Sequence, residues 1–360
     1  MSDSNNKTQS SASEVEENRS KNSINLKGLE QMKNSPKKLG IEDYVEGILQ
    51  NDRTVLSRAI TLIESSRPEH HEQAEEIIEQ CLPHTGQSIR VGITGVPGVG
   101  KSTFIETLGN HIIEEDRKLA VLAIDPSSTK SKGSILGDKT RMGTLANNPK
   151  AYIRPSPTGG SLGGVARKTR ETIYLCEAAG YDTIFIETVG VGQSETAVHS
   201  MVDFFLLLML AGAGDELQGI KRGIVEMADA IAVNKIDSSD SAQVKQAVRE
   251  YKNALHLYPK PESGWGPEVT TCSATTGKGI DVIWELIGDY VSNTKESGFF
   301  WEKRSRQAKN WIYETIQNRL MDEFYNDPNV KKKLKSVEKR VLKGEVSSFK
   351  AAKMLLEIFR

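Results

Sequence analysis

The sequence lacks a cysteine framework, a long apolar run and a large net charge of either sign. Its three cysteines, Cys81, Cys176 and Cys272, are far apart and odd in number, which excludes a disulfide scaffold and a CxxC metal knuckle. No stretch approaches the ~18 consecutive apolar residues of a membrane span. With 47 basic and 48 acidic side chains among 360 residues, the net charge of −1 excludes a generally basic nucleic-acid binder and a generally acidic disordered chain. We therefore expect a globular chain that binds neither nucleic acid nor membrane.

The N-terminal segment has no apolar signal core. Its early acids, among them Asp3 and Glu14, argue against an Arg-rich, acid-poor organelle transit peptide, and we expect a cytoplasmic protein. Residues 1–38 contain fourteen Ser or Asn and no aromatic residue. Because such a segment cannot bury enough apolar surface to offset the entropy of ordering, it is predicted to be a disordered tail.

Three further parts follow the tail. Apolar residues at helical spacing predict a helical N-terminal extension over 39–88. Over 89–292, short apolar runs alternate with helical stretches, which is typical of an α/β fold with a mostly parallel sheet covered by helices on both faces. The runs are Val91–Thr94, Leu119–Ile124, Ala151–Ile153, Thr183–Ile186, Phe204–Leu210, Ala230–Val233 and Val269–Ser273. Over 293–360 only helices are expected, with a break at Asp327-Pro328.

The C-terminal part differs from the rest in charge. Residues 302–360 contain 15 basic and 8 acidic side chains, whereas residues 1–301 carry a net charge of −8. A basic run such as Lys331 to Lys335 is usually a solvated helix face. It does not by itself indicate nucleic-acid binding.

A phosphate-binding motif follows the first predicted strand. The segment has the pattern GxxxxGK[ST] and precedes a helical run, the context that a P-loop requires. Glycines allow the loop to turn its N–H groups towards a phosphate, Lys101 supplies a cation, and the Ser102 hydroxyl is a ligand for Mg²⁺. The predicted nucleotide-binding residues here are Gly95, Val96, Pro97, Gly98, Val99, Gly100, Lys101, Ser102 and Thr103. The motif alone indicates an NTPase.

Two loops at the ends of later strands favour guanine. The segment NKID follows Val233, and the segment CSA follows Thr271. A carboxylate such as Asp237 can accept from both the ring N–H and the exocyclic amine of guanine, whereas adenine lacks that amine. The backbone N–H of Ala274 is expected to donate to guanine O6. The predicted base-binding residues are Asn234, Lys235, Asp237, Ser273, Ala274 and Thr275.

The metal and hydrolysis residues differ from those of Ras-like GTPases. The strand ending at Ile186 leads into Glu187, so a glutamate replaces the usual Walker-B aspartate, and Val191 stands where Ras-like proteins place a water-positioning glutamine. Asp125 ends the second strand, and its role is left open between a turn cap and a Mg²⁺ ligand. Intrinsic hydrolysis is therefore expected to be slow.

Three polar, glycine-containing segments are candidates for switches. In residues 127–143, Asp138 is a candidate acid for metal or water, the alternative being a solvated loop. The N–H of Gly190 is expected to sense the γ-phosphate. In the segment 211–223, Lys221 or Arg222 could approach the phosphates or a partner, the alternative being an exposed helix start.

These motifs, in this order, resemble one family. GVPGVGKST, AIDPSS, GSILGDKTRM, FIETVGVGQSE, GAGDELQGIKRGI and NKID are similar to the segments of the methylmalonyl-CoA mutase accessory GTPases (MeaB/ArgK-like), in the SIMIBI class of P-loop GTPases. The resemblance covers about residues 41–360. It implies GTP hydrolysis with Lys101, Asp138, Glu187 and Lys221 as catalytic residues, and Ser102, Asp125, Asp138 and Glu187 around Mg²⁺.

The resemblance also implies a chaperone. Such a GTPase gates the loading of adenosylcobalamin into a B12-dependent acyl-CoA mutase and protects or reactivates that mutase, to which the cobalamin belongs. It further implies a homodimer, with 293–360 as a dimerisation arm whose apolar stripe includes Trp311, Ile312 and Phe324.

Two other functions are consistent with a P-loop. A metallochaperone GTPase of the same class would need clustered soft or imidazole ligands, and His70-His71 is the only adjacent pair. A P-loop kinase would transfer the γ-phosphate of ATP to arginine or another small metabolite, which the guanine-reading loops oppose.

Overall fold

The computed structural model of the chain describes most residues beyond the N-terminal segment. The described residues are 39–124, 142–155, 162–188, 194–212 and 222–359. The chain divides into two compact units, 1–43 and 44–360. In the described part of the first unit, the Gly40 N–H donates to Asp43 Oδ2 at 2.8 Å.

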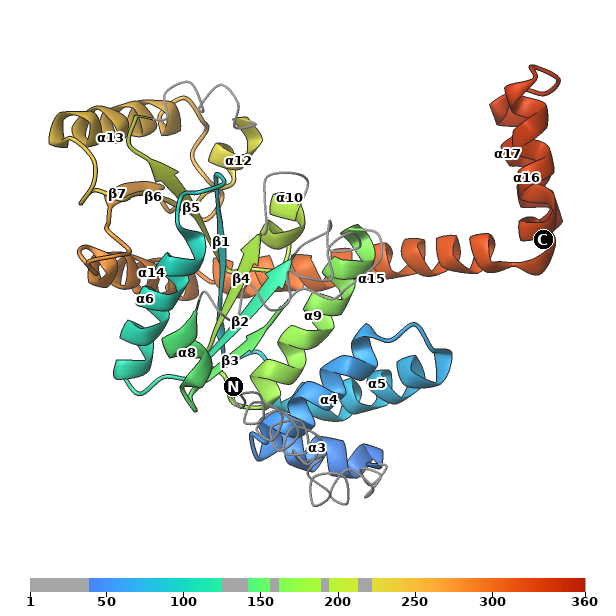
Figure 1. Ribbon diagram of the computed structural model, residues 1–360, viewed down its shortest axis with the longest axis horizontal. Helices are drawn as coiled ribbons and strands as arrows, with labels where there is room; N and C mark the ends of the chain where they lie inside the picture. Colours follow the sequence, from blue (N-terminus) through green and yellow to red (C-terminus); the bar gives the residue numbers. More distant parts are fainter. Residues whose placement is uncertain (1–38, 125–141, 156–161, 189–193, 213–221, 360) are drawn as a thin grey trace, which may run out of the picture. The chain divides into compact units, whose positions relative to one another are not determined.

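Seven parallel strands form one sheet in the order β3-β2-β4-β1-β5-β6-β7 (Figure 1). They are β1 (Ile89–Gly95), β2 (Leu119–Ile124), β3 (Ala151–Arg154), β4 (Thr183–Thr188), β5 (Phe204–Leu210), β6 (Ala230–Asn234) and β7 (Glu268–Thr271). The structure confirms the seven predicted strands. Every residue of β1, β2 and β4 is buried, as expected for parallel strands that are covered on both faces. Only β7 ends early, which leaves Cys272 and Ser273 in the following loop.

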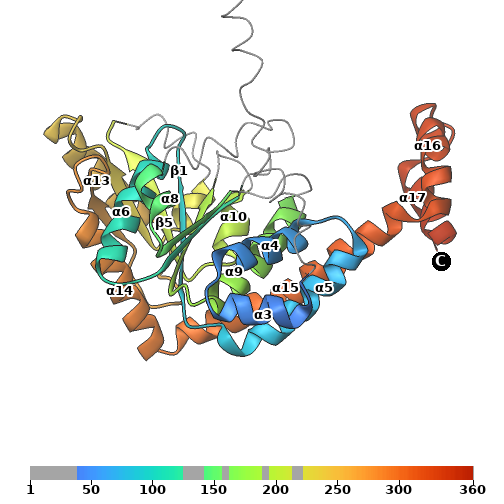
Figure 2. The ribbon, with the colours of Figure 1, turned by 60° about the horizontal axis from the view of Figure 1, so that its bottom comes forward.

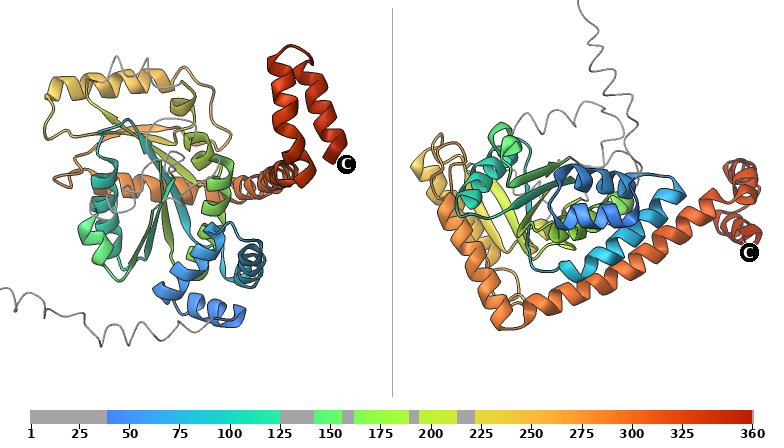
Figure 3. Two further views of the ribbon diagram at one scale, coloured as in Figure 1. Left: turned by 45° about the vertical axis from the view of Figure 1, so that its right-hand side comes forward. Right: turned by 90° about the horizontal axis from the view of Figure 1, so that it is seen from below.

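Helices cover both faces of the sheet (Figure 3). Val91 points to one face of the sheet. This face packs against α6 (Lys101–Glu114) and α14 (Ile280–Glu296) in one apolar core. Gly92 points to the other face, where a Cβ would lie 2.9 Å from a methyl group of Val198 in α10 (Ser194–His199). The other helices of this α/β part are α8 (Gly143–Asn147), α9 (Leu162–Ala178), α12 (Arg222–Glu226) and α13 (Ser241–Leu255). This is the α/β class that the sequence predicted.

Short helices precede the sheet, as the apolar spacing predicts. They are α3 (Ile41–Leu49), α4 (Arg53–Glu64), α5 (Pro68–Cys81) and the 3₁₀ turn η1 (Leu82–His84). Helices α4 and α5 pack on α9 (Figure 2). There the Lys168 Nζ donates to Glu64 O at 2.7 Å, and Glu64 forms a salt bridge with Arg154. The four-part division of the chain stays a prediction.

Three helices end the chain, and none of the helices among the described residues is long and apolar enough to cross a membrane. They are α15 (Phe299–Asn326), α16 (Pro328–Leu342) and α17 (Ser348–Phe359). The predicted break is confirmed: Asp327 Oδ1 accepts from the N–H groups of Asn329 and Val330 at 2.8 and 2.9 Å, which caps α16.

Two of the three stripe residues on α15 pack within their own chain. The Trp311 indole N–H donates to Ser200 O at 3.2 Å, and the Arg170 guanidinium lies 5.2 Å from its ring centroid. Phe324 packs edge-on against Phe359 and joins the small core of α16 and α17. Both side chains stay partly exposed beside these contacts, so a contact of either with another subunit stays a prediction. Ile312 is 59% exposed.

A buried ion network attaches α15 to the sheet at the strand ends opposite the P-loop. The Arg304 Nε and Nη2 donate to the two oxygens of Asp203 at 2.8 and 2.7 Å. Asp203 Oδ2 also accepts from the Arg90 N–H at 2.8 Å, and Arg90 forms two hydrogen bonds with Glu177 at 2.9 and 3.0 Å. Arg304 also donates to the carbonyls of Gly86 and Ser88. Every charge in this network has a partner of opposite sign.

Candidate functional site

The P-loop joins β1 to α6 at the carboxyl edge of the sheet, where open α/β sheets bind ligands. Gly98 and Gly100 have φ angles of 78° and 94°, which favour glycine because it has no Cβ. A Cβ on Gly95 would lie 2.4 Å from Leu208 O. Val96 and Val99 are buried, whereas Pro97 and Thr103 are exposed. The loop therefore has the glycine-dependent conformation that lets backbone N–H groups surround a phosphate.

Lys101 begins α6, and its Nζ donates to Gly95 O at 2.8 Å. Burial lowers the pKa of this ammonium, and the nearby carboxylates of Glu187 and Glu195 oppose that shift. The cation thus lies over the loop, between the phosphate-binding backbone and two buried acids. This position suits a lysine that contacts β- and γ-phosphates.

Ser102 and Glu187 meet beside the loop. The Ser102 hydroxyl donates to Glu187 Oε1 at 3.5 Å, and Glu187 is 5% exposed at the end of β4. Hydroxyl and carboxylate oxygens are the ligands that Mg²⁺ prefers, so this pair fits the ion. No cluster of three or more acidic, His or Cys side chains suited to a metal occurs among the described residues. A Mg²⁺ ion bound to a nucleotide takes several ligands from phosphates and water and needs few from the protein.

Asn234 joins the P-loop to both base loops. Its Nδ2 donates to Val99 O at 2.9 Å, and its Oδ1 accepts from the Ala274 N–H at 2.9 Å. Lys235 has a φ of 62°, and its Nζ donates to Gly98 O at 2.7 Å. The three segments are therefore hydrogen-bonded into one unit.

In this structure the Ala274 N–H donates to Asn234 Oδ1. Its donation to guanine O6 stays a prediction. The loop is held from behind as well, because the Thr107 hydroxyl of α6 donates to Ala274 O at 2.6 Å. Thr275 is exposed next to it. Ala274 thus contributes to the site by fixing the loop.

Asp237 is oriented by a hydrogen bond from the neighbouring base loop. The Ser273 hydroxyl donates to Asp237 Oδ1 at 2.5 Å, and the same hydroxyl oxygen accepts from the Thr276 N–H at 3.2 Å. Asp237 is itself exposed. A carboxylate oriented in this way can accept from two adjacent donors of a base edge.

A scan against family models gives a match over residues 56–329 to "Methylmalonyl Co-A mutase-associated GTPase MeaB". The chain belongs to the MeaB family. It is thus a P-loop GTPase, as its sheet order and nucleotide loops indicate. The family membership confirms the resemblance seen in the motifs, and it does not favour a metallochaperone or a metabolite kinase.

Relatives from distant organisms cover nearly the whole of this MeaB-family chain. A Mycobacterium tuberculosis protein named "Probable GTPase" is 50% identical over 321 residues, which are 88% of this chain and 96% of the relative. The mouse protein "Methylmalonic aciduria type A homolog, mitochondrial" is 44% identical over 330 residues, covering 89% of this chain and 80% of the relative. A solved structure described as "LAO/AO transport system kinase" is 35% identical, with a TM-score of 0.70 over 88% of this chain and 96% of its own.

Four predicted site residues of this MeaB-family protein lie outside the described residues. They are Asp125, Asp138, Gly190 and Lys221. The structure brings together the others: Lys101, Ser102 and Glu187 at the phosphate end, and Asn234, Lys235, Asp237 and Ser273 at the base end.

Glu195 is a residue of the site to which the sequence analysis gave no role. It lies in the first turn of α10 and is 1% exposed, and its charge acts on Lys101. Glu195 ends the motif segment GVGQSE, and a glutamate in such a polar segment would ordinarily be assigned to solvent. Its only signal in the sequence is its place eight residues after Glu187, in a segment predicted to sense phosphate.

Proposed function

We propose that this MeaB-family GTPase binds GTP with Mg²⁺ and couples hydrolysis to the service of a B12-dependent acyl-CoA mutase. In this role it gates the loading of adenosylcobalamin and protects or reactivates the mutase, which keeps the cobalamin. The main support for GTP binding is the pair of hydrogen bonds that Asn234 forms, which connect the P-loop to the predicted base-binding loops. Family membership supports the mutase as partner.

Each group has a distinct task in this proposal. The N–H groups of the loop and Lys101 hold the β- and γ-phosphates, and Asp237 selects guanine. Ser102 and Glu187 would hold Mg²⁺, which when bound offsets the negative charge of the phosphates. With its ammonium above the P-loop, Lys101 would stabilise the charge that develops on the transferred phosphoryl group, so its proposed contribution is electrostatic.

We also propose that the protein is a homodimer that assembles through α15. Five large apolar side chains on this helix are 50 to 59% exposed: Ile312, Tyr313, Ile316, Leu320 and Met321. Positions 312, 316 and 320 recur every four residues, so they lie on one face of the helix. An exposed apolar stripe of this kind marks a protein contact in many soluble proteins.

The partner is tested by GTP turnover, measured with and without each B12-dependent mutase encoded by the same genome. Turnover should rise in the presence of one mutase, and the two proteins should elute as a complex in size-exclusion chromatography with light scattering. Without mutase, the same column should give the mass of two chains. Unchanged turnover and no complex with any mutase would contradict the partner, and a single-chain mass would contradict the homodimer.

Asp237→Asn should weaken GTP binding by roughly 10- to 100-fold and shift the preference towards xanthosine nucleotides. The reason is that the asparagine NH₂ group is a donor and would face the donor groups of the guanine edge. Competition of GTP and XTP against a fluorescent GDP analogue measures both effects. Asp240→Asn is the control, since Asp240 caps α13 through the Ala242 N–H and asparagine caps equally well. Unchanged GTP affinity in Asp237→Asn would remove this residue from base recognition.

A further inference from the structure

One hydroxyl group of α6 contacts a loop at the base end of the site. Thr107 Oγ1 lies 2.6 Å from Ala274 O and 3.0 Å from Thr103 O. A threonine in a helix ordinarily donates to a carbonyl of the preceding turn, which here is Thr103 O. A hydroxyl has one proton, and the shorter distance favours Ala274 O as its acceptor. Thr107 therefore links the helix after the P-loop to a residue 167 positions further along the chain.

The Ala274 carbonyl lies in a buried loop. Ala274 is 4% exposed, and β7 has already ended at Thr271. A buried carbonyl outside a strand needs a donor from elsewhere, and Thr107 provides one. On the other side of the residue, the Ala274 N–H donates to Asn234 Oδ1 at 2.9 Å. Both peptide groups that flank the Ala274 Cα are thus oriented, one from α6 and one from the end of β6.

The loop that contains Ala274 is a closed turn. The Ser273 N–H donates to Lys278 O, and the Gly277 N–H donates to Ser273 O, both at 2.9 Å. We call residues 273–278 the base-binding turn. Because its residues are hydrogen-bonded to one another, a displacement of one of them shifts the whole turn.

The base-binding turn also orients the carboxylate that is predicted to select guanine. The Ser273 hydroxyl donates to Asp237 Oδ1 at 2.5 Å, and Asp237 is otherwise exposed. A contact that fixes the turn therefore also fixes the direction of this carboxylate. Loss of the contact with Thr107 would loosen both.

Helix α6 connects the two ends of the nucleotide site. Lys101 and Ser102 begin the helix at the phosphate end, and Thr107 lies six residues after Lys101. Six residues of α-helix span about 9 Å along the axis, and the backbone hydrogen bonds keep this rise constant. The helix thus sets the separation between the phosphate-binding groups and the base-binding turn.

We propose that Thr107 is a positioning residue for guanine recognition, whose hydroxyl holds the base-binding turn in place before a nucleotide binds. A loop that is already ordered costs less free energy to engage than one that becomes ordered on binding. The hydroxyl thus raises the affinity for the base without contacting it. This inference rests on the proposed binding of GTP, and it adds a residue outside the P-loop to recognition of the base.

The test compares GDP, which engages both ends of the site, with pyrophosphate, which engages only the phosphate end. Calorimetry on the full-length protein with Mg²⁺ measures both affinities. Thr107→Val keeps the shape of the side chain and removes the hydroxyl, so it should weaken GDP binding roughly 5- to 10-fold, as expected for one lost hydrogen bond. Pyrophosphate affinity should change by less than about 2-fold, because the phosphate-binding groups are unaltered.

Two further variants test whether the hydroxyl itself is responsible. Thr107→Ser keeps the hydroxyl and should bind GDP within about 2-fold of the unaltered protein. Thr107→Ala removes it with a residue that favours helices, so it should bind GDP as weakly as Thr107→Val. GDP affinity that valine and alanine both leave unchanged, or that serine does not restore, would overturn the proposal. A parallel loss of GDP and pyrophosphate affinity would also overturn it, because the effect would then not belong to the base end.

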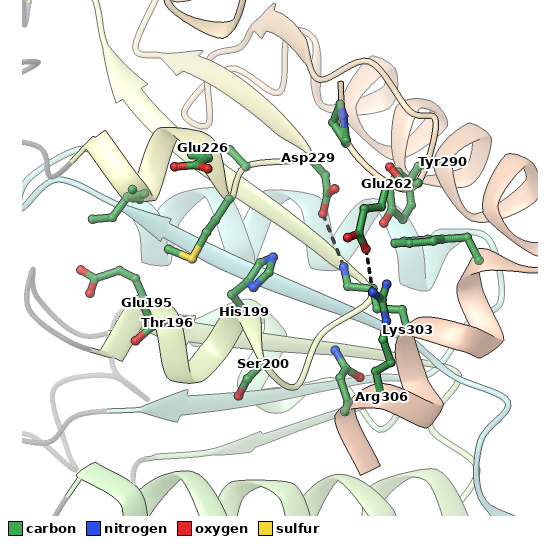
Figure 4. Close-up of a pocket in the computed structure, with 18 of the residues that line it drawn as sticks. Glu195, Thr196, His199, Ser200, Glu226, Asp229, Glu262, Tyr290, Lys303 and Arg306 are labelled. Atoms are coloured by element: carbon green, nitrogen blue, oxygen red, sulfur yellow. Dashed lines mark hydrogen bonds and ion pairs between the residues drawn. The ribbon is translucent and has the colours of Figure 1, made fainter. Parts of the chain in front are cut away.

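Two controls separate this effect from other consequences of a lost hydroxyl. Thr172→Val makes the same exchange in α9, where the hydroxyl donates to Lys168 O at 2.8 Å within its own helix, and it should leave GDP binding unchanged. Tyr290→Phe removes a hydrogen bond to Asp229, and both residues line the cavity in Figure 4. Asp229 precedes β6 at the end opposite to Asn234, so Tyr290→Phe should lower the urea midpoint but not the GDP affinity. Weaker GDP binding in both controls would show that lost stability, and not the position of the turn, lowers the affinity, which would overturn the proposal.

Failure of this inference and failure of the proposed function give different results. If the unaltered protein and Thr107→Val both bind GDP more tightly than pyrophosphate, and by the same ratio, only the role of Thr107 is wrong. If the unaltered protein binds GDP no more tightly than pyrophosphate, the proposed guanine site is itself contradicted, and the role of Thr107 with it.

Discussion

Lys101→Ala should lower single-turnover GTP hydrolysis by roughly 100- to 1000-fold, the loss seen when one charge-stabilising donor is removed from an active site. The ammonium lies over the P-loop through its hydrogen bond to Gly95 O, and it is the only basic residue in the segment from Gly95 to Thr103. Hydrogen bonds to charged groups contribute about 1.5–3 kcal/mol, so GTP affinity should also fall by roughly 10- to 150-fold. Rapid-quench hydrolysis and binding of a fluorescent GTP analogue measure the two effects separately.

Two further variants separate this loss from unfolding. Lys101→Arg keeps the charge between Glu187 and Glu195 but changes the shape of the donor, so it should fold normally and still hydrolyse poorly. Lys245→Ala removes an exposed lysine from α13 and should hydrolyse GTP like the unaltered protein. Turnover retained in Lys101→Ala would exclude the P-loop lysine from the mechanism.

The features that the sequence predicted correctly have local signals. A strand that is buried on both faces must be apolar along its length, so β2 and β5 could be delimited to the residue. The P-loop is a contiguous pattern whose glycines are required by its backbone, as the φ angles of Gly98 and Gly100 show. The break before α16 follows from Asp327 and Pro328 side by side.

Other features depend on contacts between distant parts of the chain. Nothing in the segment around Ala274 indicates that its N–H donates to Asn234, forty residues earlier. The periodicity of α15 identified Trp311 as part of an apolar stripe, but periodicity cannot tell a neighbouring helix of the same chain from another subunit. Glu195 is buried in a helix of only six residues, which is too short to show a pattern.

The largest effect on stability is expected from Arg304→Met. The substitution leaves Asp203, which is 1% exposed, without its bidentate partner, and breaking a buried ion pair in this way costs about 3–5 kcal/mol. This cost is a large part of the free energy of unfolding of a typical folded protein, which is roughly 5–15 kcal/mol. Arg319→Met is the control on the same helix, since Arg319 is 71% exposed and its ion pairs contribute little. Urea unfolding midpoints compare the two variants.

The pH dependence of this loss identifies its cause. Burial alone would raise the pKa of Asp203, but the hydrogen bonds and charges of Arg304 and Arg90 outweigh it and hold the pKa below its usual value of 3.8. The carboxylate therefore stabilises the unaltered protein at every pH above the pKa that Asp203 has in the unfolded state. This contribution is lost as pH falls through the lower pKa of the folded state. In Arg304→Met the burial effect prevails and the folded pKa rises. The variant should then be least destabilised below the unfolded-state pKa of Asp203 and should lose stability as pH rises from there through the raised folded-state pKa. A loss independent of pH would show that packing, not the charge of Asp203, is responsible. Combining Asp203→Asn with Arg304→Met should remove the pH dependence of this stability loss, because residue 203 then has no ionisable group.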